Sequence, residues 1–236
     1  MDLSVVVPAH NEAESLGPLV REIGVALGEA SYEIVLVDDG STDATSARAE
    51  EIARANPRVR VVRHPTSRGQ SFAIATGVRA ARGVWIATLD GDGQNDPADI
   101  PKLLALRGPG RAGTSGAGPL LVAGYRRKRR DSWLKRVSSR VANAVRGRLL
   151  GDRTPDTGCG LKVFEREAFL ALPHFDHMHR FLPALFLRAG GRVVSVEVAH
   201  RPRERGVSHY GMWNRLWAGI VDMFGVWWLI RRKERR

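Results

Sequence analysis

The sequence has 236 residues, of which 43% are hydrophobic and 26% are charged, as is usual for one globular domain or a domain with an appendage. Its single cysteine, Cys159, excludes a disulfide framework and favours a reducing compartment, and the first residues lack the basic region of a signal peptide. The formal net charge of +12 is uneven, because residues 1–100 hold 9 basic and 15 acidic residues whereas residues 101–236 hold 28 and 10. The basic half predicts an anionic partner: a nucleic acid, an acidic membrane surface or a phosphorylated acceptor.

Strands and helices alternate along the first half of the chain. Short apolar, β-branched runs predict strands at residues 3–8, 32–37, 59–63 and 84–89. Apolar residues at a spacing near 3.6 predict helices at residues 16–27, 43–55, 70–81 and 97–106. The alternation predicts an α/β fold with a parallel sheet covered by helices.

Three polar clusters follow three of these strands, at residues 8–12, 38–43 and 90–96. Ligands of parallel, helix-covered sheets bind outside the carboxyl ends of the strands. All three clusters fall at that edge, which is therefore the predicted binding site.

The third cluster places Asp90 and Asp92 at the end of a buried strand, separated by a glycine. Two such carboxylates are costly unless a cation or hydrogen-bond donors satisfy them, and a hard divalent ion that also binds substrate phosphates would do so. An acidic turn without a ligand is the alternative. An EF-hand loop fits poorly, because Asn95 stands where that loop needs glycine and Pro101 where it needs glutamate.

The second half begins with a stretch rich in glycine, alanine and serine at residues 107–119, which predicts a surface loop within one domain. Further strands are predicted at residues 120–124, 161–164 and 193–199, and helices at residues 132–150, 166–172 and 178–189. The helix at 132–150 follows a basic run at 125–130 and itself carries several arginines.

The C-terminal segment is predicted to lie on a membrane rather than to cross it. Residues 216–230 would span roughly 22 Å as a helix, short of the roughly 30 Å hydrocarbon core, and Asp222 interrupts them. Tryptophans next to a basic cluster at 231–236 suit an interfacial helix on anionic lipid. A helix packed on the domain is the alternative.

The motifs at residues 5–12, 37–43 and 90–97 resemble, in order and spacing, family 2 glycosyltransferases of the GT-A fold. Gln94 followed by Pro97 resembles more narrowly the polyprenyl-phosphate sugar transferases, the group of dolichol-phosphate mannose synthase and its bacterial relatives. The resemblance implies a Rossmann-like α/β domain over residues 1–210, with a mostly parallel central sheet flanked by helices. Residues 211–236 would form a C-terminal amphipathic helix and basic tail.

The resemblance also implies roles for single residues. Those at the nucleotide sugar are Pro8, Asn11, Glu12, Asp38, Asp90 and Arg126, and those expected to take part in catalysis are Asp90, Asp92 and Arg126. Asp92 and Gln94 would hold Mg²⁺ or Mn²⁺ on the donor diphosphate. Arg140, Arg205 and Ser208 would face the acceptor phosphate. Residues 156–162 match a family position only loosely, so no role is assigned to Asp156 or Lys162.

The predicted reaction is inverting transfer of a sugar from a GDP- or UDP-sugar to polyprenyl phosphate. A cation would neutralise the leaving diphosphate, and a phosphate acceptor, largely dianionic at neutral pH, needs no general base. The enzyme would be peripheral at the cytoplasmic face of the inner membrane. A family 2 enzyme with a hydroxyl acceptor is the first alternative. A basic nucleic-acid-binding module is the second, disfavoured because the arginines at 126–148 lack interleaved stacking aromatics.

Overall fold

The computed structural model describes residues 1–107, 118–126, 146–202 and 212–232. The predictions for Arg140, Arg205 and Ser208, and most of the predicted helix at 132–150, therefore lie outside the described residues.

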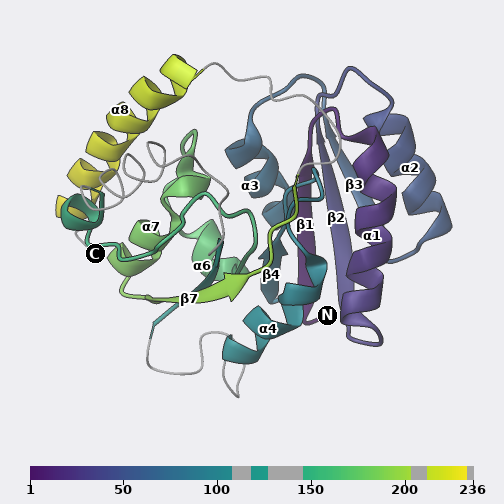
Figure 1. The fold of residues 1–236 in the computed structure, drawn as a ribbon, viewed down its shortest axis with the longest axis horizontal. Helices are drawn as coiled ribbons and strands as arrows, with labels where there is room; N and C mark the ends of the chain where they lie inside the picture. The colour runs from purple at the N-terminus through teal and green to yellow at the C-terminus, as the bar shows by residue number, and fades with distance from the viewer. Residues whose placement is uncertain (108–117, 127–145, 203–211, 233–236) are drawn as a thin grey trace.

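One seven-stranded sheet runs through the described part of the molecule (Figure 1). In chain order its strands are β1 (Leu3–Ala9), β2 (Tyr32–Asp39), β3 (Val59–His64), β4 (Trp85–Thr88), β5 (Leu120–Arg126), β6 (Lys162–Glu165) and β7 (Arg192–Val198). Their order in space is β3-β2-β1-β4-β6-β5-β7, and every pairing is parallel except the two that β6 makes with β4 and β5. The mostly parallel α/β sheet is thus confirmed, with β6 as an antiparallel strand in its interior.

Helices cover both faces of this sheet, which gives three layers. The first face packs on α1 (Ala13–Leu27), α2 (Thr45–Ala55) and α4 (Ile100–Leu104). The second packs on α3 (Gln70–Ala80), α6 (Arg166–Leu170), α7 (Leu182–Arg188) and α8 (Met212–Arg231). Short 3-10 turns stand at Pro97–Asp99, Ala105–Arg107 and Met178–Arg180, and residues 146–150 are helical.

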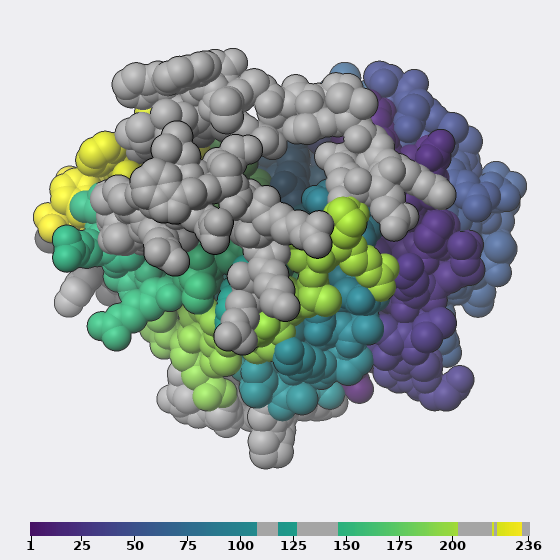
Figure 2. Space-filling model, viewed as in Figure 1, coloured from purple at the N-terminus to yellow at the C-terminus, as the bar shows by residue number. Residues whose placement is uncertain are grey.

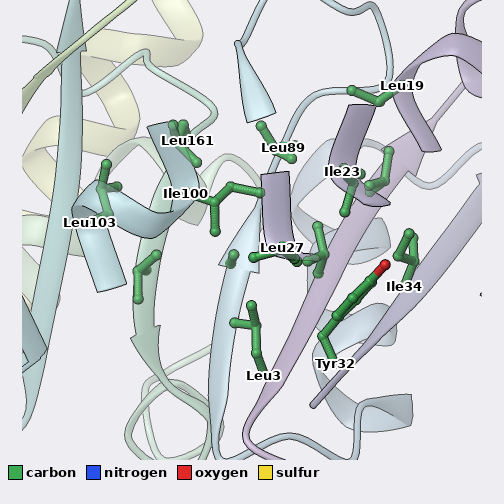
Figure 3. Packing of buried hydrophobic residues seen from close by; sticks show 14 of the residues in the cluster. Leu3, Leu19, Ile23, Leu27, Tyr32, Ile34, Leu89, Ile100, Leu103 and Leu161 are labelled. Carbon is green, nitrogen blue, oxygen red and sulfur yellow. The ribbon is translucent and has the colours of Figure 1, made fainter. Parts of the chain in front are cut away.

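Successive side chains of a strand point to opposite faces of the sheet, so they belong to the two different hydrophobic cores. Val5 and Val7 of β1 belong to the core under α1 and α4, whereas Val6 belongs to the core under α3. Figure 3 shows the first core, in which side chains of α1 and α4 meet those of the strands. On the other face α3 lies so close to β1 that a Cβ on Gly77 would come within 2.4 Å of Val6 Cγ1.

One predicted helix is interrupted. The apolar pattern at residues 178–189 predicts one helix, but the structure has a 3-10 turn at Met178–Arg180 and then α7. Pro183 stands in the first turn of α7. Because proline has no N–H, it cannot donate a hydrogen bond to the carbonyl of His179, so the helix is interrupted and a new one begins after Phe181. The predicted helix at 97–106 likewise divides into a 3-10 turn, α4 and a second 3-10 turn.

Helix α8 has one face on the protein and one face exposed, on the side of the molecule opposite α1 and α2 (Figure 1). Val226 is buried in the second core, and Asp222 Oδ2 lies 2.9 Å from His177 Nδ1. The exposed side carries Val221, Phe224 and Trp228, each more than half exposed. In the described ranges, no helix is both long enough and apolar enough to cross a bilayer.

Candidate active site

The first two polar clusters meet at the carboxyl edge of the sheet. β1 and β2 end in register, with Ala9 opposite Asp38. Beyond them the side-chain oxygen of Asn11 accepts a 2.9 Å hydrogen bond from the Thr42 backbone N–H, and the Asn11 backbone N–H donates to Ser41 Oγ at 3.0 Å. Asn11 adopts a left-handed backbone (φ 58°), which asparagine tolerates better than most residues. These contacts bring the predicted nucleotide-binding residues of the two loops together.

Hydrogen bonds from backbone N–H groups also connect the first polar cluster, residues 8–12, to α2 and to the third cluster, residues 90–96. The Glu12 backbone N–H donates to Thr45 Oγ1 at 2.8 Å, in the first turn of α2. The Gly91 backbone N–H donates to the carbonyl of Pro8 at 3.2 Å. Pro8 is buried and Glu12 is partly exposed. All three clusters therefore share one edge, as the sequence predicts.

Asp39 is a structural carboxylate. It accepts hydrogen bonds from the His64 ring at 2.7 Å, the Ser67 hydroxyl at 2.9 Å, and the backbone N–H groups of Arg68 and Gly69 at 2.9 and 2.8 Å. Burial alone would raise the pKa of Asp39, but these donors together lower it. Asp39 thus fixes the loop between β3 and α3.

Its neighbour Asp38 is equally buried, at 1% exposed, but is only half satisfied. Oδ1 accepts the Ser41 backbone N–H at 3.0 Å, whereas Oδ2 has no hydrogen-bond partner in the described part of the chain. The guanidinium of Arg63 forms an ion pair with this oxygen, with Nε 3.6 Å from Oδ2, which is too far for a hydrogen bond. A buried carboxylate oxygen without a donor is costly, and a ligand that brings an N–H to it would remove that cost.

Asp90 lies against a glycine turn from the second half of the chain. Gln70 Nε2 donates to Asp90 Oδ1 at 2.7 Å, and a Cβ on Gly160 would come within 2.3 Å of Oδ2, so a larger residue there would displace the Asp90 carboxylate. Burial, followed by repulsion from Asp92, raises the pKa of Asp90 to about 6, although Lys162 and then Arg126 oppose that rise. A raised pKa from burial and a like charge is typical of a site built for a cation or for proton transfer.

Asp92 and Gln94 occupy a partly exposed loop beyond Asp90. The Gln94 backbone N–H donates to Asp92 Oδ1 at 3.1 Å, and Gly93 between them turns with φ 72°. Carboxylate and amide oxygens are the donors that Mg²⁺ and Mn²⁺ prefer, and the repulsion between Asp90 and Asp92 is relieved by a positive charge. These residues fit a divalent ion as a partial ligand set. In the described ranges no group of three or more His, Cys, Asp or Glu side chains is placed to hold a metal.

Arg126, at the end of β5, is held by Asp156. Its Nε and one terminal nitrogen donate to the two oxygens of that carboxylate at 2.6 and 3.0 Å. Burial would lower the pKa of Arg126, but the hydrogen bonds and charge of Asp156 raise it. The carboxylate of Asp156 therefore positions the guanidinium, whose positive charge also opposes the rise in the pKa of Asp90.

The turn between Asp156 and Lys162 is fixed from both sides. The buried Lys162 ammonium donates to the carbonyls of Cys159 and Thr157, and the Thr88 hydroxyl donates to the carbonyl of Gly160 at 2.7 Å. Burial lowers the pKa of Lys162. The turn thus presents Gly160 to Asp90.

The sequence predicts no role for several residues that complete the site: Gln70, Asp156, Gly160, Lys162 and Arg201. For the turn at 156–162 the signal available was its alternation of glycines with Asp156 and Lys162 directly before a strand. Gln70 carries no comparable signal, because it reads as the first residue of a helix. Arg201 stands in an arginine-rich stretch that does not single it out.

Comparisons with known proteins show the family of the chain. The sequence model of "Glycosyl transferase family 2" matches residues 4–172. The chain is 36% identical over 241 residues to dodecaprenyl-phosphate galacturonate synthase of Rhizobium johnstonii, covering 100% of the chain and 69% of that protein. It is 35% identical over 213 residues to undecaprenyl-phosphate 4-deoxy-4-formamido-L-arabinose transferase of Edwardsiella ictaluri, covering 89% of the chain and 63% of that protein. The chain spans about two thirds of the length of these relatives.

The fold is also that of a solved glycosyltransferase. Glucosyl-3-phosphoglycerate synthase from Mycobacterium tuberculosis, in complex with Mn²⁺, UDP and glucosyl-3-phosphoglycerate, superposes with a TM-score of 0.66 at 23% identity, covering 95% of this chain and 78% of that one. At this identity the likeness shows the fold alone. Because the family match extends over more than half of the chain and a relative at 36% identity aligns with all of it, the chain belongs to glycosyl transferase family 2 and is a glycosyltransferase of the GT-A fold.

Proposed function

We propose that this enzyme transfers a sugar from a nucleoside diphosphate sugar to polyprenyl phosphate, with a divalent cation and with inversion at the anomeric carbon. The observation that carries the proposal is the pair of repelling carboxylates, Asp90 and Asp92, at the sheet edge where the nucleotide-binding loops meet. The relatives named above support the acceptor, since both act on polyprenyl phosphates by name.

The donor nucleotide would lie over the loops after β1 and β2. The unpartnered Asp38 Oδ2 would accept an N–H from the base, and both uracil and guanine offer one. Pro8, Asn11 and Glu12 would line the base and ribose, and Asp90 would face the ribose and sugar. UDP- and GDP-sugars are therefore the donors to test.

Asp92 and Gln94 would hold the cation, Mg²⁺ or Mn²⁺, together with oxygens of the donor diphosphate. When bound, the ion supplies Lewis-acid stabilisation of the charge that develops on the leaving diphosphate. Asp156 holds Arg126 in a fixed orientation, so that its guanidinium can add to this stabilisation without reorganising. Lys162 and the Gly160 turn keep Asp90 in place beside it.

The acceptor phosphate supplies its own nucleophilic oxygen. Its second pKa near 6 leaves it largely dianionic at neutral pH, so the protein must position and desolvate it rather than deprotonate it. Arg140, Arg205 and Ser208 stay the predicted contacts for this phosphate. The basic second half of the sequence suits that task.

A hydroxyl acceptor is the second candidate, and one observation favours it. A carboxylate can act as a general base, and Asp90 lies at the sheet edge where burial raises its pKa toward neutral pH. A hydroxyl needs a base, whereas a phosphate does not, so the two candidates differ in what they require of Asp90.

We further propose that residues 1–210 are the catalytic domain and that residues 211–236 attach it peripherally to the cytoplasmic face of the inner membrane. The exposed apolar face of α8 and the arginines stacked over Trp227 and Trp228 at its end support this attachment. A polyprenyl acceptor is itself a membrane lipid, so this position would bring enzyme and acceptor together.

The proposal is tested by following nucleoside diphosphate release from UDP- and GDP-sugars with a short polyprenyl phosphate, with and without Mg²⁺ or Mn²⁺. We expect release that requires the cation and falls at least 100-fold in Asp92→Asn, because this change removes a charged cation ligand. Asp2→Asn, which changes an exposed carboxylate far from the loops, is the matched control and should keep full activity.

Two results would contradict it. Undiminished release by Asp92→Asn, in a protein with wild-type thermal stability, would remove Asp92 from the cation site. Equal turnover with the matched polyprenol, which has the same chain and no phosphate, would favour the hydroxyl-acceptor candidate instead.

A further inference from the structure

The loop that carries Asp92 and Gln94 has little support of its own. Between its own residues, 92–96, the Gln94 backbone N–H donates a hydrogen bond to Asp92 Oδ1, and Gly93 between them has a left-handed backbone. Ligands on such a loop bind a metal tightly only when surrounding groups hold them in position. What holds this loop decides how well it is organised before the cation arrives.

A segment from the far end of the sheet provides the first support. The chain that leaves β7 pairs with the loop, with His200 in an antiparallel bridge to Asn95 and the Arg201 backbone N–H donating to the Gln94 carbonyl at 3.0 Å. One step earlier, the Ala199 backbone N–H donates to Asp99 Oδ2 at 2.7 Å. In Figure 2 this yellow-green segment lies between the purple surface of the N-terminal third and the teal surface that leads into α4.

The side chain of Arg201 provides the second support, and it joins three parts of the chain. One terminal nitrogen lies 2.7 Å from Glu22 Oε2 on α1, and the other lies 2.9 Å from Asp96 Oδ2 at the end of the loop. Asp96 in turn accepts the Ala98 backbone N–H at 3.0 Å and caps the following 3-10 turn. Arg201 also shares a cavity of about 310 Å³ with Asp92 and residues of α1.

We propose that Arg201 is a positioning residue, which holds the loop of residues 92–96 against α1 so that Asp92 and Gln94 are in place before the cation and donor bind. This inference rests on the proposed function, since it takes those two residues as cation ligands. It needs arginine in particular, because two nitrogens of one planar group serve two carboxylates on different elements, which a single lysine ammonium cannot do in fixed geometry.

The same contacts contribute little to the stability of the fold. The side chains of Arg201 and Glu22 are 40% and 42% exposed and that of Asp96 is 22% exposed, and ion pairs open to solvent typically add little to the stability of a fold. Variants of Arg201 should therefore fold, which separates positioning from stability.

The test measures Mn²⁺ affinity directly, from the free Mn²⁺ signal in electron paramagnetic resonance, with UDP or GDP present. We expect Arg201→Ala to weaken Mn²⁺ binding about tenfold, the effect of losing a group that orients metal ligands. Nucleotide affinity without metal and the melting temperature should stay near wild type. Arg201→Lys should recover only part of the loss, and Glu22→Gln should show a smaller loss of the same kind.

Arg48→Ala is the matched control, because Arg48 is also 40% exposed and forms a surface ion pair, with Glu51 on α2. Wild-type Mn²⁺ affinity in Arg201→Ala, or an equal loss in Arg48→Ala, would overturn the proposal. If the wild-type protein binds no Mn²⁺, or if Asp92→Asn binds it as well as wild type, the proposed function itself fails, and this inference fails with it.

Discussion

Two adjacent carboxylates, Asp38 and Asp39, show how neighbours in the sequence take different tasks. Both are buried at the end of β2, and alternate residues of a strand point to opposite sides. Asp39 meets four donors from the loop after β3, whereas Asp38 Oδ2 meets none in the described chain. One therefore holds the fold and the other is available to a ligand.

Substitution should separate these tasks. Asp39→Asn should lower the free energy of unfolding by about 2–4 kcal/mol, because two backbone N–H donors and a histidine lose a charged acceptor. Asp38→Asn should leave the melting temperature within about 2 °C and weaken nucleotide binding about tenfold. Chemical denaturation and calorimetric nucleotide titration measure the two effects, and equal destabilisation by both substitutions would contradict the assignment.

The pH dependence of stability follows from the same residues. The folded pKa of Asp39 is lowered, so its stabilisation is present at neutral pH and is lost as the pH falls through that value. Asp90 acts in the opposite direction. Its pKa rises from 3.8 to about 6, so the folded state favours its neutral form, and the stability it contributes below pH 3.8 is lost as the pH rises toward 6.

Asp90→Asn should therefore stabilise the protein when no cation is present. At pH 8 the gain in unfolding free energy should be at most about 3 kcal/mol, since each pKa unit corresponds to about 1.4 kcal/mol. The gain should shrink as the pH is lowered toward 5, and turnover should be lost at every pH. Melting curves at several pH values measure this, with Asp2→Asn as the surface control, and a less stable Asp90→Asn protein at pH 8 would refute it.

At the scale of elements, α8 presents large apolar side chains on both of its sides. Its inner side packs through Val226 and is tied by the Asp222–His177 pair, and by Arg188, which donates to the Leu229 carbonyl at 3.0 Å. Its outer side exposes Phe224 at 56% and Trp228 at 55%. In the described residues the helix thus packs on the domain and also exposes an apolar side, and its contact with a membrane stays a prediction.

That face can be tested without disturbing the packing. Phe224→Glu with Trp228→Glu should abolish binding to vesicles that contain anionic lipid, because it places two negative charges on the face proposed to enter the membrane. Val25→Glu is the matched control, since Val25 is 86% exposed and belongs to α1, a helix on the other side of the molecule (Figure 1). Co-sedimentation with vesicles measures binding, and retention of the double variant on the vesicles would exclude this face as the attachment.

Most elements could be predicted because their signals are local. The apolar period predicts α1 and α3, and the β-branched runs predict β1 and β2, each with ends within three residues of those observed. The break before α7 was missed, because the apolar pattern continues across Pro183 and conceals the missing N–H. The polar clusters of the site were likewise visible, since each directly follows a strand.

The rest of the site depends on pairings that no local pattern shows. Asp156 and Arg126 are 30 residues apart and Gln70 and Asp90 are 20 apart, so nothing in the sequence indicates that they meet. Arg201 joins Glu22 across 179 residues. Such contacts are set by the strand order of the sheet, in which chain-distant segments become neighbours.

At the scale of the whole molecule, the sheet consists of two parallel halves and one joining strand. β3, β2, β1 and β4 form the half that carries the nucleotide loops, and β5 with β7 forms the other. β6, four residues long, is the strand between them, and its first residue, Lys162, stands opposite Thr88 at the end of β4. The fold of the sheet and the turn beside Asp90 therefore depend on the same short segment.

This position of β6 has a consequence for how the protein is made. While the ribosome is still adding residues before Lys162, β4 has an unpaired edge, and such an edge can pair with strands of other chains. Closing it requires a strand that comes more than seventy residues later in the sequence, a slow, long-range step. The arrival of four residues thus closes this edge of β4, and in the same step it brings the Gly160 turn against Asp90.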